Sequence, residues 1–188
     1  VCKHLRPGIF EYEIEAEIIH EFLINNSRGF AYDPIIASGD NACILHYGSN
    51  NDVCNDGDLV LMDFGAEYAN YASDLTRCFP VNGRFSKRQK NVYNSVLRVM
   101  TAAKDLLKPG VFLHDYEKDV GLLMEKELID LKLISMKDIS KFNTTPAYKK
   151  YYMHGTSHHL GLDVHDVSEA NKPLKEGMVL TCEPGIYI

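Results

Sequence analysis

The sequence predicts an α+β fold. Short apolar runs next to turn signals indicate strands, and longer stretches with apolar residues at every third or fourth position indicate helices. The two kinds of segment do not alternate in the strict strand-helix-strand order of a doubly wound fold. With 188 residues, 45% of them hydrophobic and 24% charged, the chain can bury a core as one domain or as a compact pair of half-domains.

The amino-terminal part is expected to hold a helix and two strands. Apolar residues at Ile14, Ile18 and Phe22 recur every four positions among acidic neighbours, which predicts an amphipathic helix that ends near Asn25. Residues 34–38 and 59–64 are short apolar runs bounded by turn-forming residues, so both are expected to be strands.

Two longer helices are expected in the middle of the chain. The first begins at the capping-box residues Ser86 and Gln89 and stops at Pro109, and its inward side is expected to carry Val92, Val96, Val99, Ala103 and Leu106. The second runs from about residue 115 to residue 131 and buries Tyr116, Val120, Leu123 and Leu128. Residues 139–148 are expected to form a loop, and residues 178–183 a strand.

Asp63 stands inside a run of large apolar residues, where a carboxylate needs a partner or a cation. A hairpin that turns at Tyr68 and Ala69 would place Asp63 directly opposite Asp74. Opposed carboxylates destabilise a sheet unless they share a proton or hold cations, so a metal site is one interpretation. The other is that Asp63 caps a turn at a strand end while Asp74 faces solvent, and the spacing alone leaves both open.

Four of the eight histidines fall within residues 154–165, in a segment whose glycines allow the backbone to bend around a site. One such histidine alone is more often a surface or core residue, but their clustering favours a metal or catalytic site. His158 and His159 are adjacent, so an extended chain points them to opposite faces and one of them at most reaches a common centre. The spacing does not choose between them.

Glu183 closes another apolar run and is followed by the turn signal Pro184-Gly185. It could be an exposed acid at a strand end or a further metal ligand. Two Asp, one Glu and at least one His form an oxygen-rich set without thiolates. Such a set suits Mn²⁺, Co²⁺, Fe²⁺ or Zn²⁺ better than a structural zinc, and the paired carboxylates indicate two ions.

The composition argues against several other classes of protein. A formal net charge of −6 and the absence of clustered Lys and Arg argue against nucleic-acid binding. No apolar run approaches the ~18 residues of a membrane span. The five cysteines are scattered and never in C-x-x-C spacing, which argues against a disulfide framework and favours the cytoplasm. Ser157 lacks the G-x-S-x-G context of a serine hydrolase.

Taken in order, these motifs resemble the catalytic domain of Xaa-Pro aminopeptidases, in the pita-bread family of metallopeptidases that includes prolidases, creatinases and methionine aminopeptidases. The resemblance implies a curved antiparallel sheet covered by helices. The motifs that carry it are Arg6-Pro7-Gly8, Ile44-Leu45-His46-Tyr47, Asp63-Phe64-Gly65, Asp74-Leu75-Thr76-Arg77, residues 154–166 and Glu183-Pro184-Gly185.

The resemblance also implies roles for individual residues. Asp63 and Asp74 are implied metal ligands, with Asp74 bridging two ions, and His158 rather than His159 is the imidazole ligand. Glu183 is an implied carboxylate ligand and our candidate for proton transfer. The implied substrate-binding residues are His46, His154 and His165, and His154 and His165 join Glu183 as candidate catalytic residues.

The implied reaction is hydrolysis with two divalent ions, Mn²⁺ first and Co²⁺, Zn²⁺ or Fe²⁺ as alternatives, that releases the amino-terminal residue from peptides with proline second. Alternatives are a prolidase that acts on Xaa-Pro dipeptides and a peptide-binding module that has lost catalysis. By the resemblance, residues 1–188 are an incomplete catalytic domain without the family's amino-terminal domain and its final glutamate ligand, so this segment alone can be inactive. The full-length protein is expected to form a homo-oligomer.

Overall fold

The structure is a computed structural model that describes residues 1–139, 145–169 and 171–188. The chain forms two compact units. The first unit comprises Val1–Ser86 and Leu160–Asp166, and the second comprises Lys87–His159 and Val167–Ile188. Strands and helices mix in the way that the sequence predicted, which confirms the α+β class.

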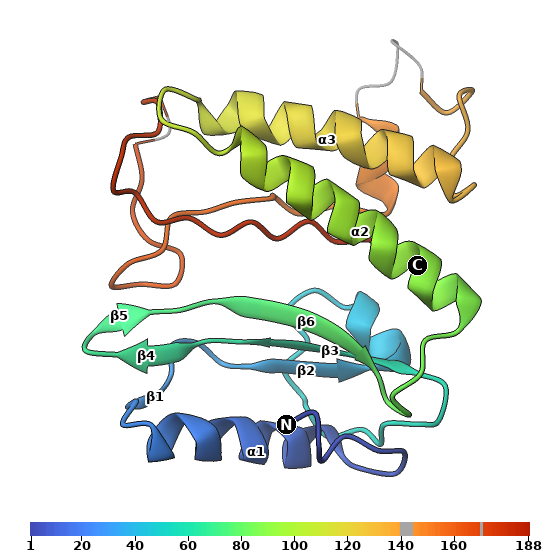
Figure 1. Ribbon diagram of the computed structural model, residues 1–188, viewed down its shortest axis with the longest axis vertical. Coiled ribbons are helices and arrows are strands. Elements are labelled where there is room, and N and C mark those ends of the chain that lie inside the picture. The colour runs from blue at the N-terminus through green and yellow to red at the C-terminus, as the bar shows by residue number, and fades with distance from the viewer. Residues whose placement is uncertain (140–144, 170) are drawn as a thin grey trace. The chain divides into compact units, whose positions relative to one another are not determined.

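The first unit holds the strands of the molecule and the first helix (Figure 1). Its strands form two three-stranded antiparallel sheets, with the orders β1-β4-β5 and β2-β3-β6. The helix α1 (Glu11–Ile24) and the short helix η1 (Gly39–Cys43) complete this unit. The strands are β1 (Gly29–Phe30), β2 (Ile35–Ser38), β3 (Leu59–Phe64), β4 (Ala66–Tyr68), β5 (Tyr71–Ala72) and β6 (Leu75–Pro80).

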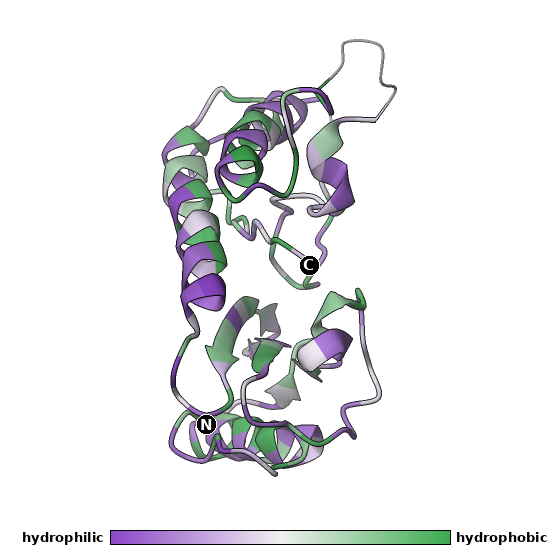
Figure 2. Cartoon of the chain, turned by 90° about the vertical axis from the view of Figure 1, so that its right-hand side faces the viewer, coloured by the Kyte–Doolittle hydropathy of each residue, from purple (hydrophilic) through white to green (hydrophobic). Residues whose placement is uncertain are grey.

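Helix α1 lies along one face of the β2-β3-β6 sheet (Figure 1). Ile14 and Ile18 are buried in the core that the helix shares with the sheet, and Phe22 packs against that core. Their spacing of four residues predicted this arrangement. Figure 2 shows hydrophobic and hydrophilic residues interspersed along the helices, as expected where one face of a helix is buried. The predicted helix and both predicted strands of this region are confirmed.

Glu11 is a fully buried carboxylate in the first turn of α1. Its oxygens accept hydrogen bonds from the backbone N–H and hydroxyl of Ser38, the side chains of Asn41 and Tyr47, and the backbone N–H of Asp52. A buried charge needs several donors to be tolerated, and this one has them. Glu11 therefore ties the loop that follows β2 to the helix.

The predicted hairpin forms, but its predicted register is wrong by two residues. The two residues of the turn are Ala69 and Asn70, with φ of 53° and 66°, the left-handed values that a type I′ turn requires. Asp63 consequently pairs with Thr76 and not with Asp74. A shift of two residues keeps every side chain on its predicted face, so Asp63 and Asp74 become diagonal neighbours instead of directly opposed ones.

The second unit contains two long helices that pack against each other, α2 (Lys87–Leu106) and α3 (Leu113–Asp130) (Figure 1). Both confirm predicted helices. The core between them includes Val99 and Ala103 from α2 together with Tyr116, Val120 and Leu128 from α3. Among the predicted loop residues, 140–144 lie outside the described residues, and the short helix η2 (Ala147–Lys150) begins within the remainder.

The predicted strand at residues 178–183 is wrong as a regular strand, because Leu180 forms only an isolated bridge with His159. The same segment pairs further with residues 156–158 through Thr181 N–H to His158 O, 3.0 Å, and Glu183 N–H to Thr156 O, 2.9 Å. The N–H groups of Thr156, Ser157 and His158 bond to side chains instead, which interrupts a regular ladder. None of the helices in the described part of the chain has the length and apolar composition needed to cross a membrane.

Candidate metal centre

The first unit brings Asp63 and Asp74 to a single tyrosine hydroxyl. The Tyr32 hydroxyl oxygen lies 2.6 Å from Asp63 Oδ1 and 3.0 Å from Asp74 Oδ1. Asp63 is the fifth residue of β3 and Asp74 directly precedes β6, so the antiparallel pairing of these strands sets the positions of both carboxylates. Tyr32 was not found from the sequence, since it stands 31 residues from Asp63 and no local pattern connects the two.

Burial raises the pKa of Tyr32 far above its ordinary value. The charge and hydrogen bond of Asp63 raise this pKa further, and those of Asp74 add a smaller increase. The hydroxyl therefore remains a neutral donor, and it has one proton for two carboxylate oxygens. Two like charges held so close destabilise each other unless a proton or a cation lies between them. The donor set of the first unit thus fits a hard divalent cation.

Gly65 allows the two arms of the hairpin to come close together beside these acids. A Cβ atom at Gly65 would lie 1.6 Å from the carbonyl oxygen of Ser73, the residue before Asp74. A real Cβ atom cannot occupy that position without displacing the backbone. The glycine that follows Asp63 and Phe64 in the sequence therefore has a steric role at this site.

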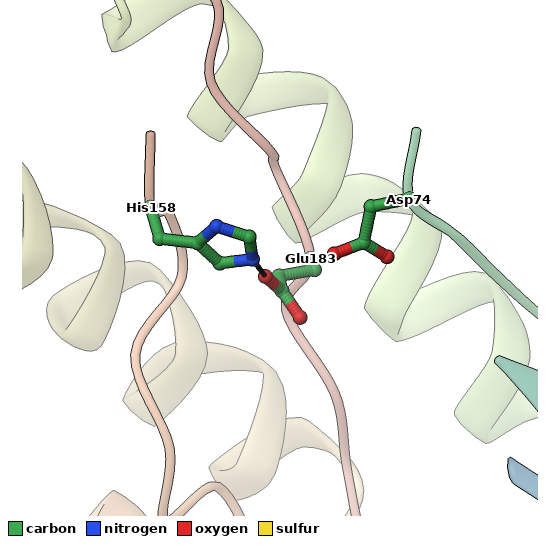
Figure 3. Close-up of side chains that lie close together, drawn as sticks. All are labelled: Asp74, His158 and Glu183. Carbon is green, nitrogen blue, oxygen red and sulfur yellow. Dashed lines mark ion pairs between the residues drawn. The ribbon is translucent and has the colours of Figure 1, made fainter. Parts of the chain in front are cut away.

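The second unit brings together His158 and Glu183, whose side chains are 24% and 31% exposed. His158 Nε2 lies 3.0 Å from Glu183 Oε1 (Figure 3). His158 Nδ1 lies 2.9 Å from the carbonyl oxygen of His159, and because a carbonyl can only accept, Nδ1 carries the proton. With Nδ1 so engaged, Nε2, the atom beside the carboxylate, is the nitrogen that is placed to bind a metal.

Thr181 connects these two side chains. Its hydroxyl oxygen accepts a hydrogen bond from the backbone N–H of His158 at 3.1 Å and donates one to Glu183 Oε1 at 2.9 Å. Sequence reasoning missed Thr181, although one signal was present: it is a hydroxyl residue in an apolar run, two positions before Glu183, and therefore on the same face in an extended chain.

The other predicted histidines occupy different environments. His154, in the second unit, donates from Nδ1 to the carbonyl oxygen of Gly155 at 2.7 Å and has Nε2 2.9 Å from the hydroxyl of Tyr187, so protein atoms engage both ring nitrogens. His46 is exposed in the first unit and has a left-handed backbone, with φ of 55°. Their roles at the substrate stay predictions.

His165 is exposed in the segment Leu160–Asp166, which packs within the first unit although its flanking residues belong to the second. The Tyr71 hydroxyl donates to Leu160 O at 3.0 Å, and the Ala72 N–H donates to Gly161 O at 2.8 Å. These bonds attach the segment to the hairpin that leads into Asp74. The structure thus places His165 on a loop anchored to strand β5, and its predicted catalytic role stays untested.

Comparison with known proteins gives the family. The whole chain, residues 1–188, matches the family described as metallopeptidase family M24. The chain belongs to this family. It is 47% identical to the Xaa-Pro aminopeptidase of Haemophilus influenzae over 97% of this chain and 43% of the relative. It is 44% identical to that of Escherichia coli, over 97% of this chain and 42% of the relative.

A mouse Xaa-Pro dipeptidase is a more distant relative, 35% identical over 100% of this chain and 42% of its own length. The chain therefore spans less than half the length of these relatives. Among solved structures, zinc-substituted E. coli aminopeptidase P in complex with product matches with a TM-score of 0.91 and 43% identity, over 98% of this chain and 43% of that one. This match confirms the pita-bread fold that the sequence resemblance implied.

Structures of alanine variants of the same E. coli enzyme have also been solved, and the spacing of the replaced residues can be compared with the spacing in this chain. Two of them replace aspartates that are eleven positions apart, the spacing of Asp63 and Asp74 in this chain. Two others replace histidines four positions apart, the spacing of His154 and His158. A further variant replaces a glutamate and is in complex with substrate.

Proposed function

We propose that the protein containing this chain is a dinuclear metal-dependent aminopeptidase that releases the amino-terminal residue from peptides with proline at the second position. The observation that carries the proposal is the presence, in an M24 chain, of two close sets of candidate ligands. One is the Asp63–Asp74 pair at the Tyr32 hydroxyl, and the other is the His158–Glu183 pair. The proposal requires both sets to face the same metal ions.

In this proposal Asp63, Asp74, His158 and Glu183 hold two divalent ions, with Mn²⁺ as the first candidate. When bound, such ions supply a nucleophilic hydroxide at neutral pH and polarise the scissile carbonyl. Glu183 would act as the proton shuttle: its carboxylate would accept a proton from the attacking water and pass it to the departing amine, while the Thr181 hydroxyl holds Oε1 of that carboxylate in place. His158 keeps its proton on Nδ1 through the carbonyl of His159, so Nε2 remains the ligand atom.

The remaining roles concern the substrate. We assign His46, His154 and His165 to substrate binding, with His165 steadying the carbonyl oxygen as its charge develops and His154 as a further candidate in catalysis. The contact of His154 with Tyr187 fits a histidine that acts together with the tyrosine hydroxyl. We further propose a cytoplasmic location, in line with five cysteines that are scattered along the sequence and never in C-x-x-C spacing. We also propose that the full-length protein forms a homo-oligomer.

Substrate length distinguishes this proposal from the prolidase alternative. The identity to the two bacterial Xaa-Pro aminopeptidases, 44% and 47%, exceeds the 35% to the mouse Xaa-Pro dipeptidase, which favours the aminopeptidase. A peptide-binding module without metal is less consistent with the chain, because it has no need for two acids that repel each other at one hydroxyl.

The test is Mn²⁺-dependent release of the amino-terminal residue by the full-length natural protein. An Xaa-Pro-Xaa tripeptide, an Xaa-Pro dipeptide and an Xaa-Ala-Xaa tripeptide are compared, each with and without a chelator. We expect chelator-sensitive cleavage of the proline tripeptide and little cleavage of its alanine counterpart. Cleavage of the dipeptide alone would move the assignment to prolidase. Failure to cleave any of the three with metal bound would favour the peptide-binding module.

A further inference from the structure

We infer that Glu117, a residue of helix α3 with no role in the proposed chemistry, is a positioning residue for the metal ligand His158. The inference rests on the proposed function, in that His158 and Glu183 are taken to bind a cation. It assigns to Glu117 the task of holding the irregular segment that ends at His158, and hence of fixing the distance between the two ligands of the second unit.

The contacts of Glu117 all reach the two residues that precede His158. Oε1 accepts hydrogen bonds from the backbone N–H of Thr156 at 2.7 Å and of Ser157 at 3.1 Å. Oε2 accepts a bond from the Thr156 hydroxyl at 3.1 Å. Three bonds to one carboxylate are charge-assisted and therefore stronger than bonds between neutral groups.

Thr156 is held from the opposite side as well. It is fully buried, its hydroxyl also bonds to the hydroxyl of the buried Tyr152, and its carbonyl accepts the N–H of Glu183 at 2.9 Å. Thr156 is therefore fixed between Glu117 on helix α3 and the backbone of Glu183. Because His158 follows two residues later, the carboxylate of Glu117 sets where His158 stands relative to Glu183.

A side chain is needed for this task because the segment lacks regular secondary structure. Residues 153–158 contain no strand or helix, and an isolated bridge joins the next residue, His159, to Leu180. Inside a regular sheet, backbone carbonyls of the strands on either side would accept the N–H groups of Thr156 and Ser157. Here the carboxylate of Glu117 accepts them, and without it two backbone donors lose their acceptor.

The same helix offers a matched control. Glu127 stands ten residues after Glu117 on α3, is 9% exposed, and bonds to Arg98 of α2 instead of to the histidine segment. Replacement of either glutamate removes a hydrogen-bonded carboxylate from α3, and both changes are expected to lower the melting temperature. Only the change at Glu117 is expected to alter the metal site.

The experiment measures the dissociation constant for Mn²⁺ by competition with a chromophoric chelator, on the full-length natural protein and at a temperature where every variant is folded. We expect Glu117→Ala to weaken Mn²⁺ binding about 10- to 100-fold, the range typical of residues that orient metal ligands. Glu127→Ala should leave the dissociation constant unchanged. Glu117→Gln keeps one oxygen that can accept both backbone N–H groups, so it should restore most of the affinity.

Two outcomes would overturn the inference, and they differ in what else they affect. If wild type binds Mn²⁺ and Glu117→Ala binds it equally well, Glu117 has no positioning role and the proposed function stands. If wild type binds none of Mn²⁺, Co²⁺, Zn²⁺ and Fe²⁺, the proposed function falls and this inference falls with it. Should Glu117→Ala fail to fold, Glu117→Asp keeps the charge but shortens the side chain by one methylene, which withdraws the carboxylate from the N–H groups of Thr156 and Ser157. A dissociation constant equal to that of wild type in this variant would count against the inference.

Discussion

The two units place their candidate ligands by different means. In the first unit, Asp63 and Asp74 stand on or beside paired strands, so backbone hydrogen bonds of the sheet fix their positions. In the second unit, His158 and Glu183 stand on segments without regular secondary structure, and the side chains of Thr181 and Glu117 accept the N–H groups that a sheet would otherwise pair. The candidate ligands of the first unit depend on backbone geometry, and those of the second unit depend on individual side chains.

This difference determines which substitutions should matter. In the first unit, Asp63 and Asp74 should keep their positions when most neighbouring side chains are replaced. A substitution that separates the strands should displace them. In the second unit, loss of one hydroxyl or carboxylate should displace a ligand while the helices remain folded.

Asp74→Asn is expected to have the largest effect on metal binding. The amide keeps the size of the side chain and can still accept a bond from the Tyr32 hydroxyl, but it removes the charge that a bridging ligand requires. Mn²⁺ affinity should fall more than about 100-fold, beyond the range for residues that only orient ligands. The metal-free protein should melt no lower than wild type, since repulsion with Asp63 is relieved.

Metal analysis and thermal denaturation of the metal-free protein measure the two effects of Asp74→Asn. Asp33→Asn is the control, because Asp33 is an exposed acid next to Tyr32 and its replacement removes the same charge from the same region. Undiminished occupancy by two metal ions in Asp74→Asn would defeat the assignment of Asp74 as a bridging ligand.

The two units can be compared by adding a Cβ atom to a glycine beside the candidate ligands of each, with Gly65→Ala in the first unit and Gly155→Ala in the second. The quantity compared is the loss of unfolding free energy. A Cβ atom at Gly65 would meet the Ser73 carbonyl oxygen at 1.6 Å, so the strands must separate, and we expect a loss of about 1–3 kcal/mol in unfolding free energy. A Cβ atom at Gly155 would lie 3.7 Å from Glu117 Oε1, an ordinary contact, and should cost less than about 0.5 kcal/mol.

Urea denaturation of the two glycine variants and wild type measures these losses. Equal losses at both positions would contradict the contrast between a rigid hairpin and a segment held by side chains. A stable Gly65→Ala protein with full metal affinity would show that the hairpin can open without moving Asp63 or Asp74.

The sequence predicted the candidate ligands of the first unit better than those of the second, for a physical reason. Strand periodicity has a period of two, so an error of two residues in the hairpin register still left Asp63 and Asp74 on one face. In the second unit no periodicity relates His158 to Glu183, and the spacing could not separate His158 from His159. The resemblance to a known family made that choice.

The residues that sequence reasoning missed are those that act over long separations in the chain. Tyr32 lies 31 residues from Asp63, and Glu117 lies 39 residues from Thr156. The strand predicted at residues 178–183 was wrong for the same reason. Its apolar pattern indicates an extended chain, but whether a ladder forms depends on the partner segment, whose N–H groups bond to Glu117 and Thr181.

Thr181→Val tests the role of side chains in the second unit directly. Valine has nearly the same shape as threonine but has no hydroxyl, so the His158 N–H loses its acceptor and Glu183 Oε1 loses a donor. We expect Mn²⁺ binding to weaken about 10- to 100-fold, measured by chelator competition. Thr181→Ser keeps the hydroxyl and should bind like wild type. A Thr181→Val protein with wild-type affinity would show that backbone pairing alone places the two ligands.

Glu127→Gln is expected to have the smallest effect, because its contacts join two regular helices. Arg98 Nε donates to Glu127 Oε1 at 2.9 Å, and this bond, together with a smaller contribution from Ser95, lowers the pKa of Glu127 from its ordinary 4.5 even though burial opposes it. Arg98 is 59% exposed, so solvent screens the pair and its loss should cost only about 1 kcal/mol near neutral pH.

The pH dependence of this cost follows from the direction of the pKa shift. Because the folded protein holds Glu127 at a lower pKa than the unfolded chain does, the stabilisation is complete above about pH 4.5 and is lost as the pH falls through the folded pKa. Urea denaturation of wild type and Glu127→Gln at a series of pH values should therefore show a constant difference in unfolding free energy near neutrality and a shrinking one below about pH 4.5. A difference that grows on acidification would mean that the folded protein raises the pKa of Glu127.

Metal affinity should not change in this variant at any pH where it is folded, since the ligands of the second unit depend on Glu117 and Thr181 and not on the bond between the helices.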